Sequence, residues 1–370
     1  MTVYFVTFIS SFFVCALGER MYACNRKNIS AGFMFLAVLI PAILAGIRDY
    51  TVGTDVATYG HWLFSSALNA NSLKWFMISN KSIDILYSAF VYFVAWFFKS
   101  EHWLYFFSGL ITYLFVMLTL CHYRKYMNVS FAWLSYLFLF YGDSLNAMRQ
   151  CMAVAIAFWG FHFFQEHKWK AGIIITVIAC LFHNTAIVTF GIAIVYYLIE
   201  KKDTRIFKFW ILFVTTLIFI SYSKLINLGV GIGILNDKFL RYELANQVVF
   251  SFNPILIRLP YIFIIWLFYH NFSGKNRSDE QLSSFMILMI LMEMLSAELR
   301  IVHPTLYRVS LYFGVYRCLG LGRVVGSLKI SNRRIVSAVL LLLFVVTWIY
   351  QNVVQGNNEI YPFTSQLIGI

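Results

Sequence analysis

Residues 28–47, NISAGFMFLAVLIPAILAGI, run from Lys27 to Arg48 without a charged side chain. The hydrocarbon core of a bilayer requires about 20 apolar residues in one helix, so this stretch predicts a transmembrane helix. Hydrophobic residues make up 61% of the 370 positions and charged residues 12%, which leaves too little polar surface for a soluble chain. We therefore expect an all-α, polytopic integral membrane protein.

Similar apolar runs recur along the chain and predict about 11–13 transmembrane or re-entrant helices. No period repeats and no low-complexity tract interrupts the pattern. We therefore predict a single transmembrane domain over residues 1–370, with external segments at 48–82 and 223–253. The candidate helices cover 2–17, 30–47, 83–98, 103–121, 129–141, 147–164, 170–183, 185–199, 206–222, 254–270, 282–297, 305–320 and 335–354.

The net charge of +13 comes from basic residues in short clusters between the apolar runs. This pattern is typical of positive-inside loops and argues against a nucleic-acid partner. The six cysteines form no CxxC pair and are interpreted as packing residues. Acidic residues and histidines do not recur at metal-ligand spacing, so neither a metal nor a cofactor is expected.

Basic loops belong on the cytoplasmic side, which orients most of the chain. Arg149 and His183 then lie outside. Because both flanks of the apolar run 171–200 are basic, the chain must turn near its middle, at His183-Asn184-Thr185. The loops assigned to the inside contain Arg124 with Lys125, residues 167–170, Lys201 to Arg205, Lys275 with Arg277, and residues 317–334.

The first hundred residues do not fit this orientation directly. Basic residues before position 28 favour an external 48–60 segment, but two full spans after it would place Arg124 outside. Either 61–82 or 83–98 is a re-entrant or surface helix, or the N-terminus is cytoplasmic and 48–60 faces inward. We favour the re-entrant alternative, because irregular backbone is tolerated where it lines a polar cavity.

Two polar motifs indicate an anion-binding site. In the segment 46–59, Gly53 predicts a turn whose Thr54 or Asp55 caps the next helix, and the segment is either an ordinary solvated loop or a binding loop for anions and hydroxyl groups. Residues 146–150, NAMRQ, are predicted to open a helix with three polar side chains on one face. Arg149 there either binds an anion at the helix N-terminus or extends to lipid phosphate.

Three further features complete the candidates. His183 is either a proton acceptor or a structural histidine bonded to backbone. Pro304 is predicted to start a helix that places Arg308 one turn inside, with Tyr312 at i+4. In residues 235–250, apolar side chains recur near helical spacing with charged side chains between them, which predicts an amphipathic helix on the outer surface.

These motifs, in this order, resemble the EpsG-like family of Wzy-type bacterial polysaccharide polymerases. They are the Arg-Asp-Tyr-x-Val-Gly-Thr-Asp core within 46–59, Asn-x-x-Arg-Gln at 146–150, the turn at 181–186, and Arg308 with Tyr312 and Phe313. The resemblance implies a GT-C-like glycosyltransferase, multi-pass in the bacterial inner (plasma) membrane. It would polymerise undecaprenyl-diphosphate-linked oligosaccharide repeat units at the outer face, making O-antigen of lipopolysaccharide, capsule or exopolysaccharide. Its implied partners are those lipid-linked glycans, the lipid bilayer, a chain-length regulator and a flippase.

Residue roles follow from this resemblance and from the chemistry of a lipid diphosphate leaving group. Arginines would hold the diphosphate, and a histidine or carboxylate would activate the acceptor hydroxyl. The candidate catalytic residues are His183, Asp55 and Asp49. The candidate substrate-binding residues are Arg48, Tyr59, Asn146, Arg149, Gln150, Arg308 and Tyr312.

Three other classes compete with the polymerase. A lipid-linked oligosaccharide flippase would share the arginines but should show two related halves, which the sequence lacks. A membrane O-acyltransferase would need a histidine deep in a polar cavity and less emphasis on external arginines. An ion-coupled transporter would carry more acidic residues within its spans than Asp84 and Glu293.

Overall fold

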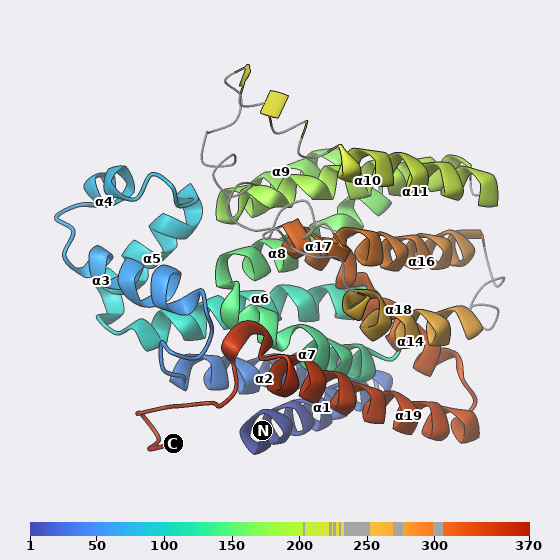
Figure 1. Cartoon of the computed structure of the whole chain (residues 1–370). Helices are drawn as coiled ribbons and strands as arrows, with labels where there is room; N and C mark the ends of the chain where they lie inside the picture. Colours follow the sequence, from blue (N-terminus) through green and yellow to red (C-terminus); the bar gives the residue numbers. More distant parts are fainter. Residues whose placement is uncertain are drawn as a thin grey trace. The chain divides into compact units, whose positions relative to one another are not determined.

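The computed structural model describes residues 1–202, 204–221, 252–268, 277–298 and 306–370, with isolated positions between 224 and 232. Helices and turns make up this described part, and no strand occurs in it. The chain forms two compact units, one of residues 1–190 with 328–370 and the other of residues 191–327 (Figure 1). The predicted all-α class is confirmed. The prediction of a single transmembrane domain stays a prediction.

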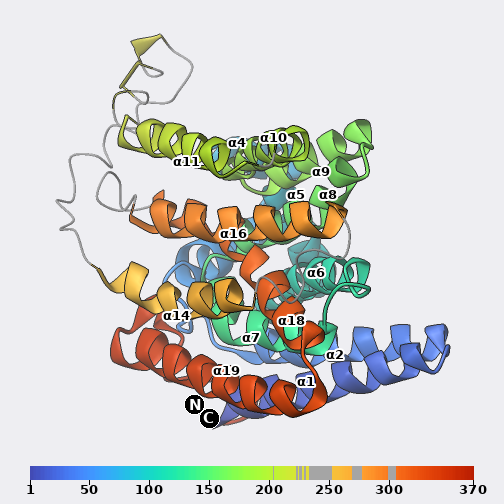
Figure 2. The same ribbon diagram turned by 90° about the vertical axis from the view of Figure 1, so that its right-hand side faces the viewer.

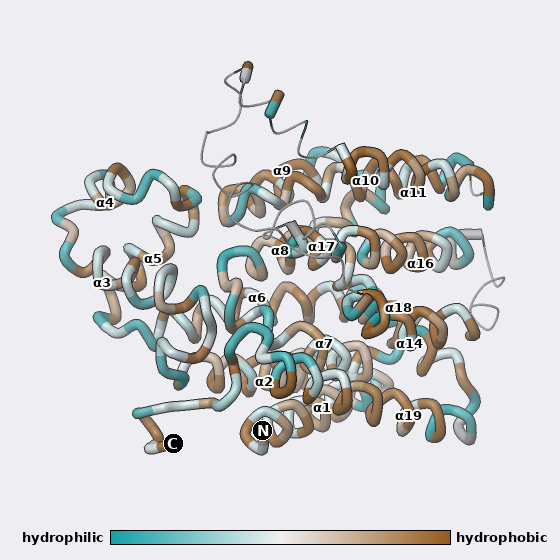
Figure 3. The backbone as a smooth tube through the Cα atoms, viewed as in Figure 1, coloured by the Kyte–Doolittle hydropathy of each residue, from teal (hydrophilic) through white to brown (hydrophobic). Residues whose placement is uncertain are grey.

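Five helices in the described part are long and apolar enough to cross a membrane. They are α1 (Thr2–Ala23), α2 (Lys27–Ile47), α6 (Glu101–His122), the Glu280–Ala297 part of α16 (Arg277–Ala297), and the Asn332–Val354 stretch of α19 (Ile330–Ile349) with η5 (Tyr350–Val354). Figure 3 shows hydrophobic residues along these helices and hydrophilic residues gathered at many of the turns between helices. The chain is therefore a polytopic membrane protein, as its hydropathy predicts.

The first unit is built on α1, α2, α6, α7 (Val129–Asn146) and α8 (Met148–Gln165). α7 and α8 are buried along almost their whole lengths, and α1 lies beside α2 (Figure 2). Glu19 near the end of α1 accepts hydrogen bonds from the Val129 and Ser130 N–H groups at 2.6 and 2.9 Å. A carboxylate there satisfies free donors at the start of α7 and stabilises the positive end of that helix.

This unit also contains α19 and η5, and its remaining elements are shorter. They are η1 (Ala57–Trp62), α3 (Leu63–Leu68), α4 (Leu73–Ser79), α5 (Ile85–Phe98), α9 (Trp169–Phe182), η2 (Asn184–Ile187), the start of α10 (Val188–Lys201) and η6 (Asn357–Glu359).

The second unit contains the rest of α10, α11 (Arg205–Ile220), α14 (Asn253–Leu267), α16, η4 (Leu306–Val309), α17 (Ser310–Gly314) and α18 (Tyr316–Ser327). Its interior holds one carboxylate between two arginines. Glu293, which is 1% exposed, accepts from Arg258 Nε at 2.7 Å and lies 3.0 Å from Arg317 Nη2. This pairing offsets the cost of charges among apolar helices, so Glu293 has a structural role.

The end of α2 lies beside the start of α6. This contact bears on the orientation of the first hundred residues. His102 Nδ1 donates to the Gly46 carbonyl at 2.9 Å, and Arg48 lies over the Tyr105 ring. The chain between them therefore begins and ends on one side. Its helices α3, α4 and α5 have 6, 7 and 14 residues, short of the about 20 needed to cross. With Arg124 inside, this geometry favours the external placement of 48–60 and a non-crossing 61–98.

Most helix predictions are confirmed, but several details were wrong. The predicted 305–320 span is divided into η4, α17 and α18, which reaches Ser327. Asn146 does not share a helix with Arg149. It is the last residue of α7, and Ala147, with ψ 54°, separates α7 from α8. Neither Thr54 nor Asp55 caps the next helix, since Val56 is the N-cap of η1 and makes no side-chain cap bond.

Two further predictions are confirmed, and two others concern residues outside the described ranges. The Gly53 turn forms, with φ +112°, and the apolar run 171–200 breaks at His183. Pro304 and the predicted amphipathic helix at 235–250 lie outside the described residues, as does most of the 223–253 segment.

Candidate active site

Arg149 is the centre of the polar cluster in the first unit. It occupies the first turn of α8, where its Cζ lies 3.9 Å from the centre of the Tyr59 ring and 5.8 Å from that of Tyr87. Its Nη1 pairs with Asp84 Oδ2 at 3.1 Å. The Arg149 and Asp84 side chains are 15% and 17% exposed, so the ion pair is partly shielded from water yet still reachable. A guanidinium held on an aromatic face keeps its outer edge available to an anion.

Asp84 also connects Arg149 to the His183 turn. Its other oxygen, Oδ1, accepts the Asn184 N–H at 3.3 Å. One carboxylate therefore joins the start of α5, the start of α8 and the end of α9. The Arg149 motif and the His183 turn therefore lie close together in the structure, and Asp84 contacts both of them.

The hydrogen bonding of His183 determines what its ring can do. Nδ1 lies 2.7 Å from Thr185 Oγ1 and accepts from the Thr185 N–H at 3.3 Å, which caps η2. An Nδ1 that accepts is unprotonated, so in the neutral ring Nε2 carries the hydrogen. His183 then presents a hydrogen-bond donor, not a base, at Nε2.

The 48–56 loop is held against the junction of α7 and α8. Asn146 Oδ1 accepts the Asp55 N–H at 2.7 Å. Gly53 approaches the same junction so closely that a Cβ would meet Val56 at 2.8 Å and the Leu145 carbonyl at 3.2 Å. With φ +112°, this position requires glycine.

The C-terminal segment completes the same region. Asn358 accepts from Asn146 Nδ2 at 3.0 Å and donates to Asp143 Oδ1 at 3.1 Å. The Gly53 N–H donates to the Glu359 carbonyl at 3.1 Å. Residues more than 200 positions apart in the sequence therefore fix the loop that carries Asp55.

Arg48 lies behind this surface rather than on it. It is 1% exposed, and its Nη2 donates to the Leu145 carbonyl at 2.8 Å and contacts Met148 Sδ at 3.2 Å. Burial lowers the pKa of the Arg48 guanidinium from its usual value, but arginine stays protonated in proteins. Arg48 thus contributes a fixed positive charge beneath the start of α8 and ties the loop to it.

The other predicted site residues have different surroundings. Asp49 Oδ1 accepts the Gln366 N–H at 2.9 Å, so the C-terminal segment holds it. Gln150 is 2% exposed and faces the interior. Arg308, in η4, and the buried Tyr312, in α17, belong to the second unit, whereas the Arg149 cluster belongs to the first, so their part in the same site stays a prediction.

Three residues of the cluster were missed from the sequence: Asp84, Tyr87 and Asn358. Asp84 had a detectable signal, since an acidic residue directly before an apolar helix is costly unless it has a partner. Tyr87 and Asn358 had no such signal, because in the sequence alone both resemble ordinary residues of the membrane interface.

The described part of the chain is helical, and an arginine–carboxylate pair lies at the start of one of its buried helices. These features define the class, a polytopic membrane protein with a partly shielded ion pair. The EpsG family model matches residues 31–365, and the chain belongs to that family. The protein is therefore a membrane protein of polysaccharide biosynthesis. No curated protein and no solved structure matched the chain.

Proposed function

We propose that this protein is a glycosyltransferase that polymerises undecaprenyl-diphosphate-linked repeat units at the outer face of the bacterial inner membrane. The observation that carries the proposal is the placement of Arg149. A guanidinium in the first turn of a buried helix, supported by Tyr59 and by the positive end of the helix dipole, is suited to a diphosphate.

The reaction transfers a growing glycan from its lipid carrier to a new unit. The acceptor hydroxyl oxygen bonds to the anomeric carbon of the donor sugar, and the bond from that carbon to the diphosphate breaks. The lipid diphosphate leaves with the bonding electrons. Arg149 stabilises this developing charge, with Arg48 adding positive potential from beneath the helix start.

Asp84 receives the proton of the acceptor hydroxyl in this proposal. In the resting protein its charge is neutralised by Arg149 at 3.1 Å. When a diphosphate takes over Arg149, Asp84 loses its cation partner and gains a neighbouring anion, which raises its affinity for a proton. Binding of the leaving group thereby activates the base. Asp55 and Asp49 remain the carboxylate alternatives, while the Nε2–H of His183 would donate to a sugar or phosphate oxygen.

The geometry of the first unit supports an external site. The 48–56 loop, the start of α8 and the His183 turn all gather at one end of that unit. The ends of α6 and α8 that adjoin the basic loops lie at the opposite end. The positive-inside rule assigns that opposite end to the cytoplasm. A flippase and a chain-length regulator are the expected partners at the outer face.

Deletion of the gene followed by analysis of surface and lipid-linked glycans tests the proposal. A polymerase mutant should leave a single repeat unit on the outer surface, because export continues and elongation stops. A flippase mutant should leave none outside, and an O-acyltransferase mutant should leave full-length chains without acyl groups. Either of the last two results would overturn the polymerase assignment.

A further inference from the structure

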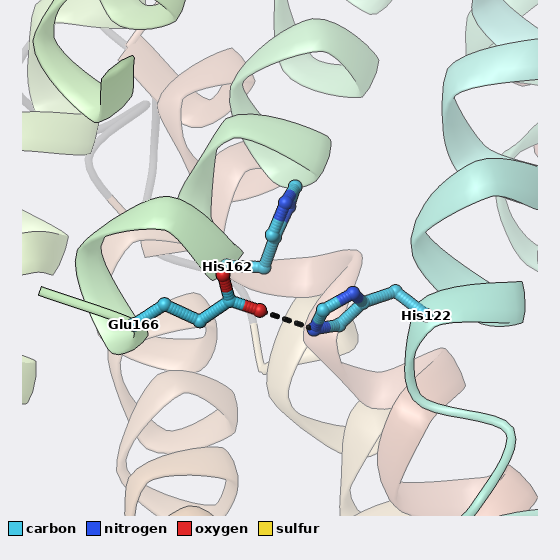
Figure 4. Close-up of side chains that lie close together, drawn as sticks. All are labelled: His122, His162 and Glu166. Atoms are coloured by element: carbon cyan, nitrogen blue, oxygen red, sulfur yellow. Dashed lines mark ion pairs between the residues drawn. The ribbon is translucent and has the colours of Figure 1, made fainter. Parts of the chain in front are cut away.

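A second cluster of titratable side chains lies at the other end of the first unit. His122 is the last residue of α6, His162 lies on α8, and Glu166 directly follows α8 (Figure 4). One ligand atom from each of the three residues lies within 4.8 Å of the other two. His122 Nε2 and Glu166 Oε1 are 3.6 Å apart. His162 is buried, whereas the other two are exposed, so the cluster opens at the protein surface.

The buried histidine makes a hydrogen bond of the kind that metal-ligating histidines make. His162 Nδ1 donates to the Trp159 carbonyl, and the Phe163 ring packs 3.9 Å from the His162 ring centre. A histidine ligand usually gives its other N–H to a backbone carbonyl or carboxylate, which fixes the tautomer and the ring direction. This bond leaves His162 Nε2 as the nitrogen with an available lone pair.

The spacing of His122 and Glu166 fits a small divalent ion, and a ligand atom of His162 lies within 4.8 Å of both. Zinc lies about 2.0–2.2 Å from histidine nitrogen and carboxylate oxygen, which puts tetrahedral ligands roughly 3.3–3.5 Å apart. The His122–Glu166 separation of 3.6 Å is close to this value. His162 and Glu166 share a helix face at i and i+4, and a hydrogen bond from Tyr123 to Gln165 already joins the ends of α6 and α8.

We propose that His122, His162 and Glu166 form a site for a divalent transition metal of the zinc class that links the ends of α6 and α8. Two imidazoles and one carboxylate provide three ligands, and water completes the coordination. The site is separate from the Arg149 cluster and takes no part in the proposed transfer reaction. Positive-inside loops flank it, so the cytoplasm would supply the metal.

Lys168 lies beside the proposed ligand Glu166, where its positive charge opposes the binding of a metal cation. Its Nζ binds Glu166 Oε2 at 2.7 Å, whereas Oε1 faces His122. Removing the ammonium should therefore strengthen metal binding, because it removes a positive charge beside the bound cation.

The test uses the full-length protein in detergent or nanodiscs, stripped of metal and titrated with Co²⁺ and Zn²⁺. We expect one Co²⁺ per chain, with the visible absorption bands of a four-coordinate ion, displaced by Zn²⁺. His122→Gln, His162→Gln and Glu166→Gln should each weaken binding at least about tenfold. Lys168→Met should tighten it. His61→Gln is the matched control, because His61 pairs with Glu101 at 2.5 Å in a histidine–carboxylate pair at the opposite end.

A stably folded wild-type protein that binds no Co²⁺ at micromolar concentration would overturn the proposal. So would equal binding by wild type and all three ligand variants. Should the buried His162 variant fail to fold, the exposed His122 and Glu166 variants carry the test alone.

Discussion

Arg149 is the residue on which the proposed chemistry depends most. Its planar guanidinium pairs with Asp84 and stacks on Tyr59, a geometry that an ammonium cannot reproduce. Losing one charge-stabilising contact of this kind should cost about 3 to 4 kcal/mol, or about 100- to 1000-fold in rate. We therefore expect Arg149→Lys and Arg149→Ala to reach the membrane normally and to leave single repeat units on the cell surface.

The matched control for Arg149 is Arg26→Ala, which removes an exposed loop cation and should leave chain length unchanged. Glycan gels and immunoblots of membrane fractions give both readouts. Wild-type chain lengths from a well-expressed Arg149→Ala variant would remove Arg149 from the site.

Asp84 is expected to matter through its charge and not through its shape. Asp84→Asn keeps an oxygen for the Asn184 N–H but cannot take a proton from the acceptor. Elongation with purified protein and lipid-linked substrate should fall by about 10²- to 10⁴-fold, while binding of the lipid diphosphate is retained or improved. A small loss with an unchanged pH–rate profile would mean that Asp84 only positions Arg149, and Asp55 would then be the base to test.

Among the elements, the short helices between α2 and α6 determine which motifs share a side of the membrane. In a background lacking the six native cysteines, Thr51→Cys and Asn184→Cys should react with an impermeant maleimide in spheroplasts. Lys125→Cys, the inside control, should react only after permeabilisation. All three positions are exposed, and the Asn184 change keeps the backbone N–H that Asp84 binds.

Labelling of position 184 but not position 51 would separate the two motifs by a bilayer. The expected result follows from the contact between His102 and Gly46, which returns the chain to its starting side before α6. The sequence allowed both placements, because apolar residues at 83–98 read the same whether the helix crosses or lies at the surface.

At the scale of the whole molecule, the C-terminal segment should be as necessary as the motifs it supports. Asn358 holds Asn146 and Asp143, and neighbouring backbone holds Gly53. Each lost bond to a half-buried polar group costs about 1–3 kcal/mol, so elongation should fall by about tenfold or more. We expect this from Asn358→Gly, which suits the positive φ of that position, and from truncation after Gln355.

Asn357→Gly is the control for that prediction, because the Asn357 side chain is exposed and bonds only to Gln355. Membrane insertion should be normal in all three variants. Full-length polymer from the truncated protein would show that the segment is dispensable for the site.

The sequence by itself determined the class of this protein, nearly all of its helices and its most informative arginine. These features are local: a run such as 28–47 is apolar whatever surrounds it, and a charge beside such a run needs a partner wherever it lies. Only the tertiary structure decided which residues those partners are. Asp84 meets Arg149, Asn358 meets Asn146, and His122 meets Glu166 through the packing of helices far apart in the chain, and no local pattern encodes that packing.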